Sequence, residues 1–170
     1  GINPGRFGAG ITGITFTDPI ALEKFCGIPN HLPKKRELSC TFVYEFIRRF
    51  GGVQKFYRDF YLTAISPLGF VKNGINYNFY DHPALLRRVT PFIIKSIRAH
   101  LKMGARRDIA IVLGTGKNNS ALHELNQKHN FFGRIIALEH PRFILQYRRK
   151  KINEYLKKYQ SVFSEAFKSI

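Results

Sequence analysis

Apolar side chains recur every three to four residues in several segments of the chain, and this spacing predicts amphipathic helices. In the clearest case, Ser39 to Phe50, the diglycine Gly51-Gly52 ends the pattern. Asp18 followed by Pro19 is typical of a helix start, with the aspartate as the capping residue. The helical segments predicted in this way are 18–25, 39–50, 53–57, 83–102, 121–129 and about 146–167.

Three short runs rich in β-branched and aromatic residues, 60–65, 108–113 and 134–138, have the length of buried strands. A polar, Asn-rich loop is expected over 72–81. Strands separated by helices predict βαβ units and a parallel sheet covered on both faces. We therefore expect an α/β fold, a three-layer α/β/α sandwich with a central parallel sheet of about four strands. Residues 1–170 are expected to form a single domain that lacks an upstream segment carrying the first strand.

The charge of the chain indicates what it binds. It has 28 Lys and Arg against 11 Asp and Glu, a formal net charge of +17. Such a surplus favours a polyanion, because phosphate contacts release condensed counterions and supply most sequence-independent affinity. The alternative is that the basic residues only solvate the surface. They cluster in Arg48-Arg49, Arg87-Arg88, Arg106-Arg107 and Arg148-Arg149-Lys150-Lys151.

Other site classes receive little support from the sequence. Cys26 and Cys40 form no CxxC pair, so neither a zinc site nor a disulfide framework is indicated, and we expect an intracellular, reduced protein without metal or cofactor. No apolar stretch reaches bilayer length. Gly114-Thr115-Gly116-Lys117 lacks the earlier glycine and the hydroxyl of a phosphate loop, which favours a tight turn from strand to helix.

Two separated segments carry the candidate chemistry. Gly1-Ile2-Asn3-Pro4-Gly5 and His140-Pro141-Arg142 each read as a loop at the carboxyl end of a strand. A parallel sheet would bring the Asn3 amide and the His140 imidazole to one cleft. For His140 the competing interpretation is a hydrogen-bonded structural histidine, and for Asn3 it is an Asx-turn before Pro4.

These segments resemble motifs of a known family. Gly1 to Gly8, continuing through Thr12-Gly13 to Phe16, is similar to the first motif, G-M-N-P-G-P-F-G continuing to T-G-V-P-F, of the single-strand-selective monofunctional uracil-DNA glycosylases, a branch of the uracil-DNA glycosylase superfamily. His140-Pro141-Arg142 resembles their second motif, H-P-S-P-R, with a shorter loop. Ala64 to Leu68 resembles their N-x-C-P-L strand end. The three landmarks come in the family's order and span nearly the whole chain.

The resemblance implies a role for each matching residue. Asn3 would position the water that attacks the anomeric carbon, and His140 would hydrogen-bond the uracil O2 and stabilise the leaving base. Phe16 would stack on the flipped base, and Gly5 would leave space beside the C5 edge of the base. The implied base-binding set is Gly1, Ile2, Pro4, Gly5, Phe16 and Ala64.

Two departures from the family pattern concern specificity and the DNA contact. Ala64 stands where the family has a uracil-reading asparagine, so that the base must be read by Asn73, Asn76 or Asn78 on the next loop or by backbone groups. Arg142 or Phe143 is expected to be the wedge that fills the vacated base stack. The expected DNA-binding and wedge residues are Pro141, Arg142, Phe143 and Lys117.

Together these features predict a monomeric, monofunctional DNA glycosylase. It would flip uracil, and other deaminated bases, out of single- or double-stranded DNA and hydrolyse the N-glycosidic bond, leaving an abasic site. We expect no membrane partner, and a location in the cytoplasm, or the nucleoid if the source is bacterial. Two alternatives stay open: a glycosylase directed mainly at hypoxanthine or xanthine, and a catalytically silent nucleic-acid-binding protein of the same fold.

Overall fold

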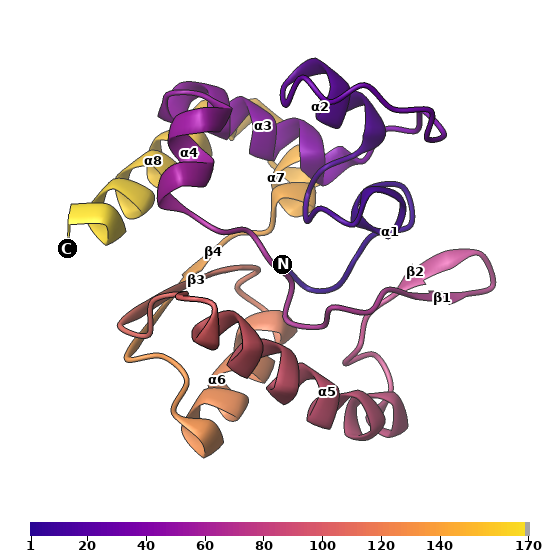
Figure 1. Ribbon diagram of the computed structural model, residues 1–170, viewed down its shortest axis with the longest axis vertical. Coiled ribbons are helices and arrows are strands. Elements are labelled where there is room, and N and C mark those ends of the chain that lie inside the picture. The colour runs from indigo at the N-terminus through magenta and orange to yellow at the C-terminus, as the bar shows by residue number, and fades with distance from the viewer. Residues whose placement is uncertain (169–170) are drawn as a thin grey trace. The chain divides into compact units, whose positions relative to one another are not determined.

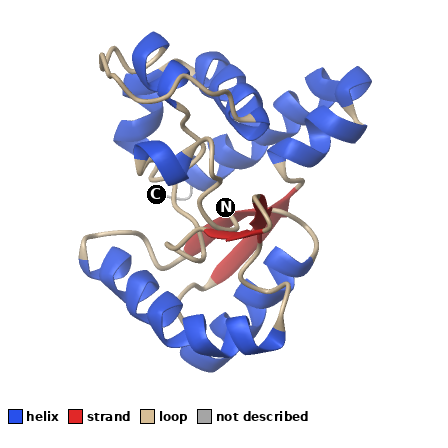
Figure 2. Ribbon diagram, turned by 90° about the vertical axis from the view of Figure 1, so that its right-hand side faces the viewer, coloured by secondary structure: helices blue, strands red, loops and turns tan. Residues whose placement is uncertain are grey.

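The computed structural model describes residues 1–168, and the chain divides into two compact units. The first, called the sheet unit here, comprises Gly1–Arg6 and Thr63–Leu138. The second, called the helical unit, comprises Phe7–Leu62 and the chain from Glu139 onward. All strands of the described chain belong to the sheet unit, and the fold is mixed α/β (Figure 2).

Two parallel strands and two helices form the centre of the sheet unit. Strand β3 (Ile109–Leu113) pairs with β4 (Arg134–Leu138) over their full lengths. Helix α5 (Pro83–Lys102) precedes β3, and α6 (Lys117–His129) connects it to β4 (Figure 1). The helix predicted over 83–102 is confirmed, whereas α6 begins four residues before the predicted 121. The buried core is formed by Ile65, Phe79, Val89, Ile93, Ile97, Val112, Leu122, Leu125 and Phe131.

A hairpin occupies part of the expected polar loop. Strands β1 (Phe70–Lys72) and β2 (Ile75–Tyr77) are antiparallel, so the prediction of a loop over 72–81 is wrong for its first half. The turn residues Asn73 and Gly74 have φ angles of 50° and 73°. Positive φ at both central positions is the requirement of a type I′ hairpin turn, which the sequence Asn-Gly favours strongly.

The segment 60–65 is not a strand, although its composition predicted one. Its end is extended and pairs with the first two residues of the chain. Gly1 N donates to Thr63 O at 2.7 Å, Ile65 N to Gly1 O at 3.0 Å, and Ser66 N to Ile2 O at 3.0 Å. The first two bonds have the pattern of a parallel pair. Because this pairing is so short, the parallel sheet of residues 1–168 contains two strands and not the expected four.

The helical unit is built around aromatic side chains. Its elements are α1 (Ala9–Thr12), α2 (Pro19–Lys24), α3 (Leu38–Phe50), α4 (Val53–Asp59), α7 (Pro141–Tyr147), the 3-10 turn η1 (Arg149–Lys151) and α8 (Ile152–Lys168). Phe46 of α3 lies against Phe56, Tyr159 and Phe163, with ring centroids 4.8 to 5.6 Å apart. Tilted and edge-on contacts of this kind are favourable and bury large apolar areas.

The sequence prediction for the last helix is wrong at its start, because three separate elements replace it. A helix was expected from about Gln146, but α7 already begins at Pro141 and α8 only at Ile152. No helix within residues 1–168 has both the length and the apolar character needed to cross a bilayer.

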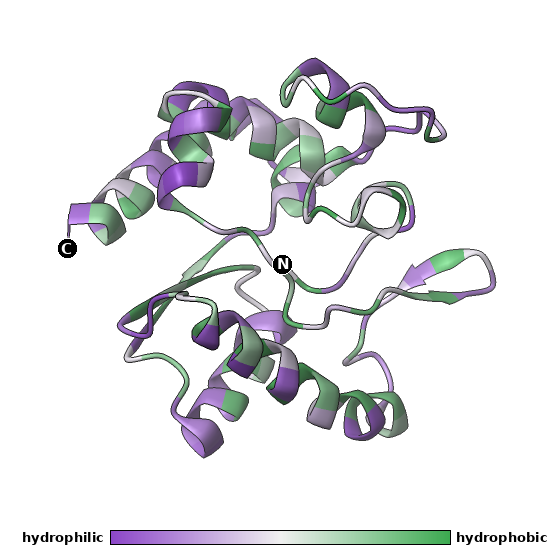
Figure 3. Cartoon of the chain, in the orientation of Figure 1, coloured by the Kyte–Doolittle hydropathy of each residue, from purple (hydrophilic) through white to green (hydrophobic). Residues whose placement is uncertain are grey.

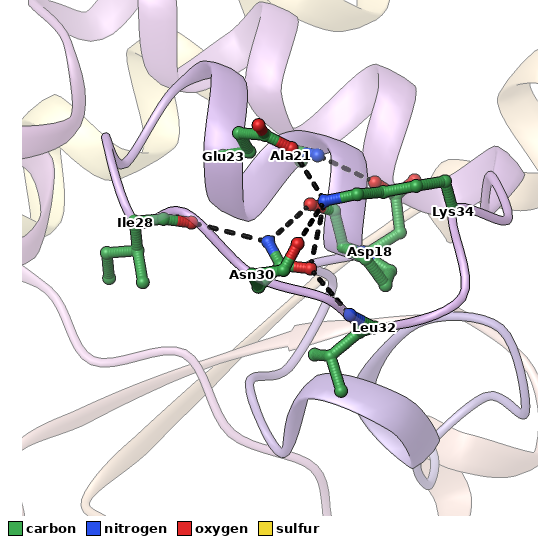
Figure 4. A network of polar contacts seen from close by, with 8 residues as sticks. Asp18, Ala21, Glu23, Ile28, Asn30, Leu32 and Lys34 are labelled. Atoms are coloured by element: carbon green, nitrogen blue, oxygen red, sulfur yellow. Dashed lines mark hydrogen bonds and ion pairs between the residues drawn. The ribbon is translucent and has the colours of Figure 1, made fainter.

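Asp18 caps α2 as predicted, and it also bonds the residue before α3. Its carboxylate accepts from Ala21 N at 2.8 Å, which caps α2, and its other oxygen accepts from Glu37 N at 2.9 Å. Asn30 and Lys34 fasten the following loop, through Asn30 Nδ2 to Pro19 O at 3.0 Å and Lys34 Nζ to Glu23 at 2.6 Å (Figure 4). One side-chain bond to backbone and one ion pair therefore hold this loop against α2. Figure 3 shows that the helices of both units carry alternating polar and apolar positions.

Candidate active site

Asn3 follows the short paired segment Gly1-Ile2 in the sheet unit. Its Nδ2 donates to Tyr77 O, and its Oδ1 accepts from Phe79 N, both at 3.3 Å. The amide thus faces the backbone that follows β2, and the oxygen makes no Asx-turn bond within its own loop. A carbonyl oxygen has two lone pairs. Oδ1 can therefore accept a second hydrogen bond, for example from a water molecule.

Gly69 touches the loop that carries Asn3. A Cβ atom at position 69 would lie 2.7 Å from Pro4 O and 3.4 Å from Pro4 Cβ. Real Cβ atoms essentially never approach a carbonyl oxygen so closely, so only glycine fits here without a shift of backbone. Gly69 was not among the residues selected from the sequence, and its only signal there is its place directly after the Ser66-Pro67-Leu68 segment.

The three asparagines proposed as base readers already have structural roles in the sheet unit. Asn73 forms the hairpin turn, and Asn76 Oδ1 accepts from Arg6 N at 3.1 Å. Asn78 is linked to Asp81, whose carboxylate accepts from Asn78 N at 2.8 Å and from Asn78 Nδ2 at 3.4 Å. Ala64, where the resemblance would place an asparagine, is buried.

His140 lies two residues after β4 and caps helix α7 in the helical unit. Its Nδ1 accepts from Arg142 N at 3.1 Å. Burial lowers the pKa of the imidazole from 6.5 to about 4, and the nearby Arg142 guanidinium contributes in the same direction. The ring is therefore neutral at physiological pH, and because Nδ1 is an acceptor, the proton is on Nε2. Within residues 1–168 no hydrogen-bond partner is found for Nε2.

Phe16 lies next to His140 in the helical unit. The two ring centroids are 5.9 Å apart and the ring planes are inclined by 57°. Phe16 is 6% exposed and has a φ angle of 58°. A positive φ is unusual for an aromatic residue and costs about 1–3 kcal/mol. The surrounding turn maintains it, since Thr12 Oγ1 donates to Thr17 O at 2.6 Å and Thr17 N donates to Ile14 O at 3.1 Å.

Gly8 ends the first motif against a buried carboxylate of the same unit. A side chain at position 8 would overlap the carboxylate of Glu37. The pKa of Glu37 is raised, chiefly by burial and then by the charge of Asp18, while Arg142 opposes the rise. Glu37 was not predicted from the sequence, because a lone acidic residue between helices carries no motif.

The segment after His140 is a helix start and not the loop that the sequence predicted. Pro141 occupies the first helical position and is buried. Arg142 is exposed, and Phe143 is 39% exposed with the Arg148 guanidinium 5.5 Å from its ring centroid. These two side chains therefore stand on the first turn of α7, where they are accessible to a ligand.

Lys117 begins α6 directly after the glycine-containing turn that follows β3. Lys117, Gly116 and Thr115 are exposed, and Gly114 has a φ angle of 137°. This confirms the expected tight turn from strand to helix. A helix N-terminus with a lysine attracts negative charge.

The structure thus groups the candidate residues by unit. Asn3 and the three loop asparagines belong to the sheet unit, as do Ala64 and Lys117, whereas Phe16, His140 and the start of α7 belong to the helical unit. Phe16 and His140 are in contact. Residues 1–168 contain no group of three or more His, Cys, Asp or Glu side chains that could hold a metal ion.

Comparisons with known proteins agree with the sequence motifs. A family model described as the Uracil DNA glycosylase superfamily matches residues 1–164. The crystal structure of wild-type SMUG2 from Pedobacter heparinus is similar to this chain, with 46% sequence identity and a TM-score of 0.92 over 97% of this chain and 73% of that chain. No curated protein matches. With nearly its whole length matched by the family model, the chain belongs to the uracil DNA glycosylase superfamily.

Proposed function

We propose that the chain is a monofunctional DNA glycosylase that hydrolyses the N-glycosidic bond of uracil, and of other deaminated bases, in DNA. The observation that carries this proposal is His140, which presents a neutral imidazole with its proton on Nε2, next to the ring of Phe16. The family membership supports the reaction class. We further propose that residues 1–170 act as one domain. In this proposal the paired segments 1–2 and 63–66 act as two further short strands beside β3 and β4, which gives the parallel sheet its expected four strands.

The leaving base needs a hydrogen-bond donor. As the C1′–N1 bond breaks, the bonding electrons move to the base and negative charge develops on its O2 and N1 atoms. A neutral Nε2–H group prearranged at O2 stabilises this charge, and one such donor contributes about 3–4 kcal/mol in known sites. An imidazole with a pKa of about 4 stays neutral and retains this geometry near pH 7.

The attacking water needs an acceptor. In the proposal, Asn3 Oδ1 uses its second lone pair to hold this water, while Tyr77 and Phe79 fix the amide plane. The water oxygen forms a bond to C1′ as the base leaves, and its proton passes to solvent, because an amide is too weak a base to retain it. Holding the water in the reactive geometry raises the rate, because the entropic cost of orienting it is met before the reaction step.

The flipped base would stack on Phe16. Stacking of a base on an aromatic side chain is worth about 1–3 kcal/mol and does not depend on the identity of the base. With an alanine at position 64, the discrimination between bases falls to Gly1, Ile2, Pro4, Gly5 and backbone groups, or to the loop asparagines once they exchange their present partners. A site without an asparagine at position 64 favours excision of several deaminated bases and not of uracil alone.

A panel of single-lesion oligonucleotides tests the proposal. Excision of uracil, hypoxanthine and xanthine is measured separately in single-stranded and double-stranded DNA. We expect release of free uracil and an alkali-labile abasic site. Preference for hypoxanthine or xanthine would support a glycosylase directed at these purines. DNA binding without any base release would support a catalytically silent nucleic-acid-binding protein.

Affinity for undamaged DNA should fall steeply with salt. The basic clusters would contact several phosphates, and each contact steepens the slope of log affinity against log salt by about 0.9 for duplex DNA. We expect a slope steeper than about −4, measured by fluorescence anisotropy between 50 and 200 mM salt. A slope near zero would contradict phosphate contact.

Gly69→Ala should slow excision by about 10-fold or more, because the new Cβ would displace Pro4 O and with it the Asn3 loop. The measurements are single-turnover excision and melting temperature. Gly27→Ala is the control: Gly27 has a φ of 67° and open space around it, so its loss strains the backbone without a close contact. We expect Gly27→Ala to lower stability while excision is retained. Normal excision by Gly69→Ala would show that the close approach is irrelevant to the site.

A further inference from the structure

Helix α5 has an outer face that carries positive charge only. The 20 residues Pro83–Lys102 include no Asp or Glu. Five exposed cations, Arg87, Arg88, Lys95, Arg98 and Lys102, lie on the helix, and no ion pair of the described chain involves any of them. With 3.6 residues per turn, these five positions fall within an arc of about 100° along a helix about 30 Å long.

The core face of α5 lies on the opposite side of the helix. Val89, Ile93 and Ile97 are its buried residues and belong to the core of the sheet unit. Their mean direction is about 180° from that of the cations. Ile2, the neighbour of Asn3, packs against this same core. The basic face is therefore directed away from the segment that carries Asn3.

Helix stability explains only Lys102, because the helix dipole favours a cation in the last turn and disfavours Arg87 and Arg88 near the start of the helix. Lys95 and Arg98 are three residues apart, and Arg98 and Lys102 four, so that like charges face each other and destabilise the helix by a few tenths of a kcal/mol per pair. Arg48 and Arg49 of α3, in contrast, share an ion pair partner in Glu45, and Lys34, Arg58 and Lys158 are also paired. A face with charges of one sign only, most of which the helix itself does not favour, is better explained by a negatively charged partner.

We propose that the outer face of α5 binds the phosphate backbone of DNA outside the stretch that holds the target base. A row of unpaired cations about 20 Å long, from Arg88 to Lys102, can follow several consecutive phosphates. The exposed Phe92, 44% accessible at the edge of the face, adds an apolar contact for a sugar or base. Such a second surface would keep the protein on DNA between encounters with lesions. This inference rests on the DNA partner of the proposed function.

The test is the double variant Lys95→Gln/Lys102→Gln with a charge-matched control, Lys34→Gln/Arg58→Gln, whose two cations are already ion-paired with Glu23 and Asp59. Glutamine preserves helix propensity. The probes are an undamaged duplex of about 40 base pairs and a lesion oligonucleotide of about 10 nucleotides. For the long duplex we expect the α5 variant to reduce the salt slope by about 1.8, and the control to change it far less.

Excision separates this inference from the proposed function. Single-turnover excision of the short lesion oligonucleotide should be equal in wild type and in both variants. Equal loss of long-duplex affinity in the two variants would mean that only net charge matters and would overturn the inference. Unchanged DNA binding combined with lost binding to phosphatidylserine vesicles would assign the face to membranes instead. If wild type excises no base but the α5 variant still reduces the salt slope, the proposed function is wrong and the assignment of α5 as a DNA-binding surface is retained.

Discussion

Replacing His140 by alanine should reduce single-turnover base excision by about 100-fold or more while DNA binding remains largely intact. The reason is the loss of the Nε2–H donor at the position where the leaving base gains negative charge, an effect of about 3–4 kcal/mol on the barrier. His140 also caps α7 through Nδ1. Its removal is therefore expected to cost about 1 kcal/mol of stability as well.

His140→Ser separates the two roles of this residue. A serine hydroxyl is a good helix cap, so this variant should recover the melting temperature of the wild type. It cannot reach the base, and its excision should stay as low as that of His140→Ala. Recovery of activity together with stability would show that His140 acts only as a cap.

The fall of the excision rate at acidic pH is expected from the helix cap that His140 forms. The pKa of His140 in the folded chain is about 4, below its ordinary 6.5, so the neutral form is favoured. Its contribution to stability is complete above pH 6.5 and is lost as the pH falls through 4. Protonation places a hydrogen on Nδ1 opposite the Arg142 N–H group and breaks the cap. The excision rate of wild type should accordingly fall near pH 4. A fall of the excision rate near pH 6.5 would contradict the lowered pKa of His140.

Replacing Asn3 by alanine should also abolish most excision, by about 100-fold or more, because the attacking water loses its acceptor. The variant should still bind a lesion oligonucleotide, since Phe16 and His140 remain. Some loss of stability is expected as well, because the bonds to Tyr77 and Phe79 disappear with the side chain. The measurements are excision, lesion binding and melting temperature on one preparation.

Asn126 provides a matched control in the same unit. Its amide also donates to a backbone carbonyl and accepts from a backbone N–H, both on Phe132 and both at 2.8 Å. Asn126→Ala should lower the melting temperature at least as much as Asn3→Ala and leave excision intact. If the two variants lose excision and stability in parallel, Asn3 is a structural brace and not a catalytic residue.

The sequence predicted those elements whose signals are local. Asp18 and Pro19 begin a helix as expected, and the period of apolar residues placed α5 correctly. The hairpin was missed although Asn73-Gly74 favours a type I′ turn, because its strands are only three residues long. Helix α7 was missed because it is short and a charged run follows it.

The candidate site residues were selected from the sequence by their types and motifs, whereas their hydrogen bonds could not be predicted. The placement of His140 just after a strand followed from the run 134–138, and this placement is confirmed. The tautomer of His140 depends on where α7 begins, and the partners of Asn3 lie more than 70 residues away. Contacts between distant segments leave no local pattern, which is why Gly69 and Glu37 were also missed.

We propose above that this chain cleaves the glycosidic bond with Asn3 and His140. The most direct test measures release of free uracil from a uracil-containing oligonucleotide under single-turnover conditions by wild type, Asn3→Ala and His140→Ala, with binding measured in parallel. We expect wild type to release uracil, and each variant to lose about 100-fold or more of the excision rate while it binds with similar affinity. Wild type that binds but releases no base, or a variant that retains a rate close to that of wild type, would contradict this proposal.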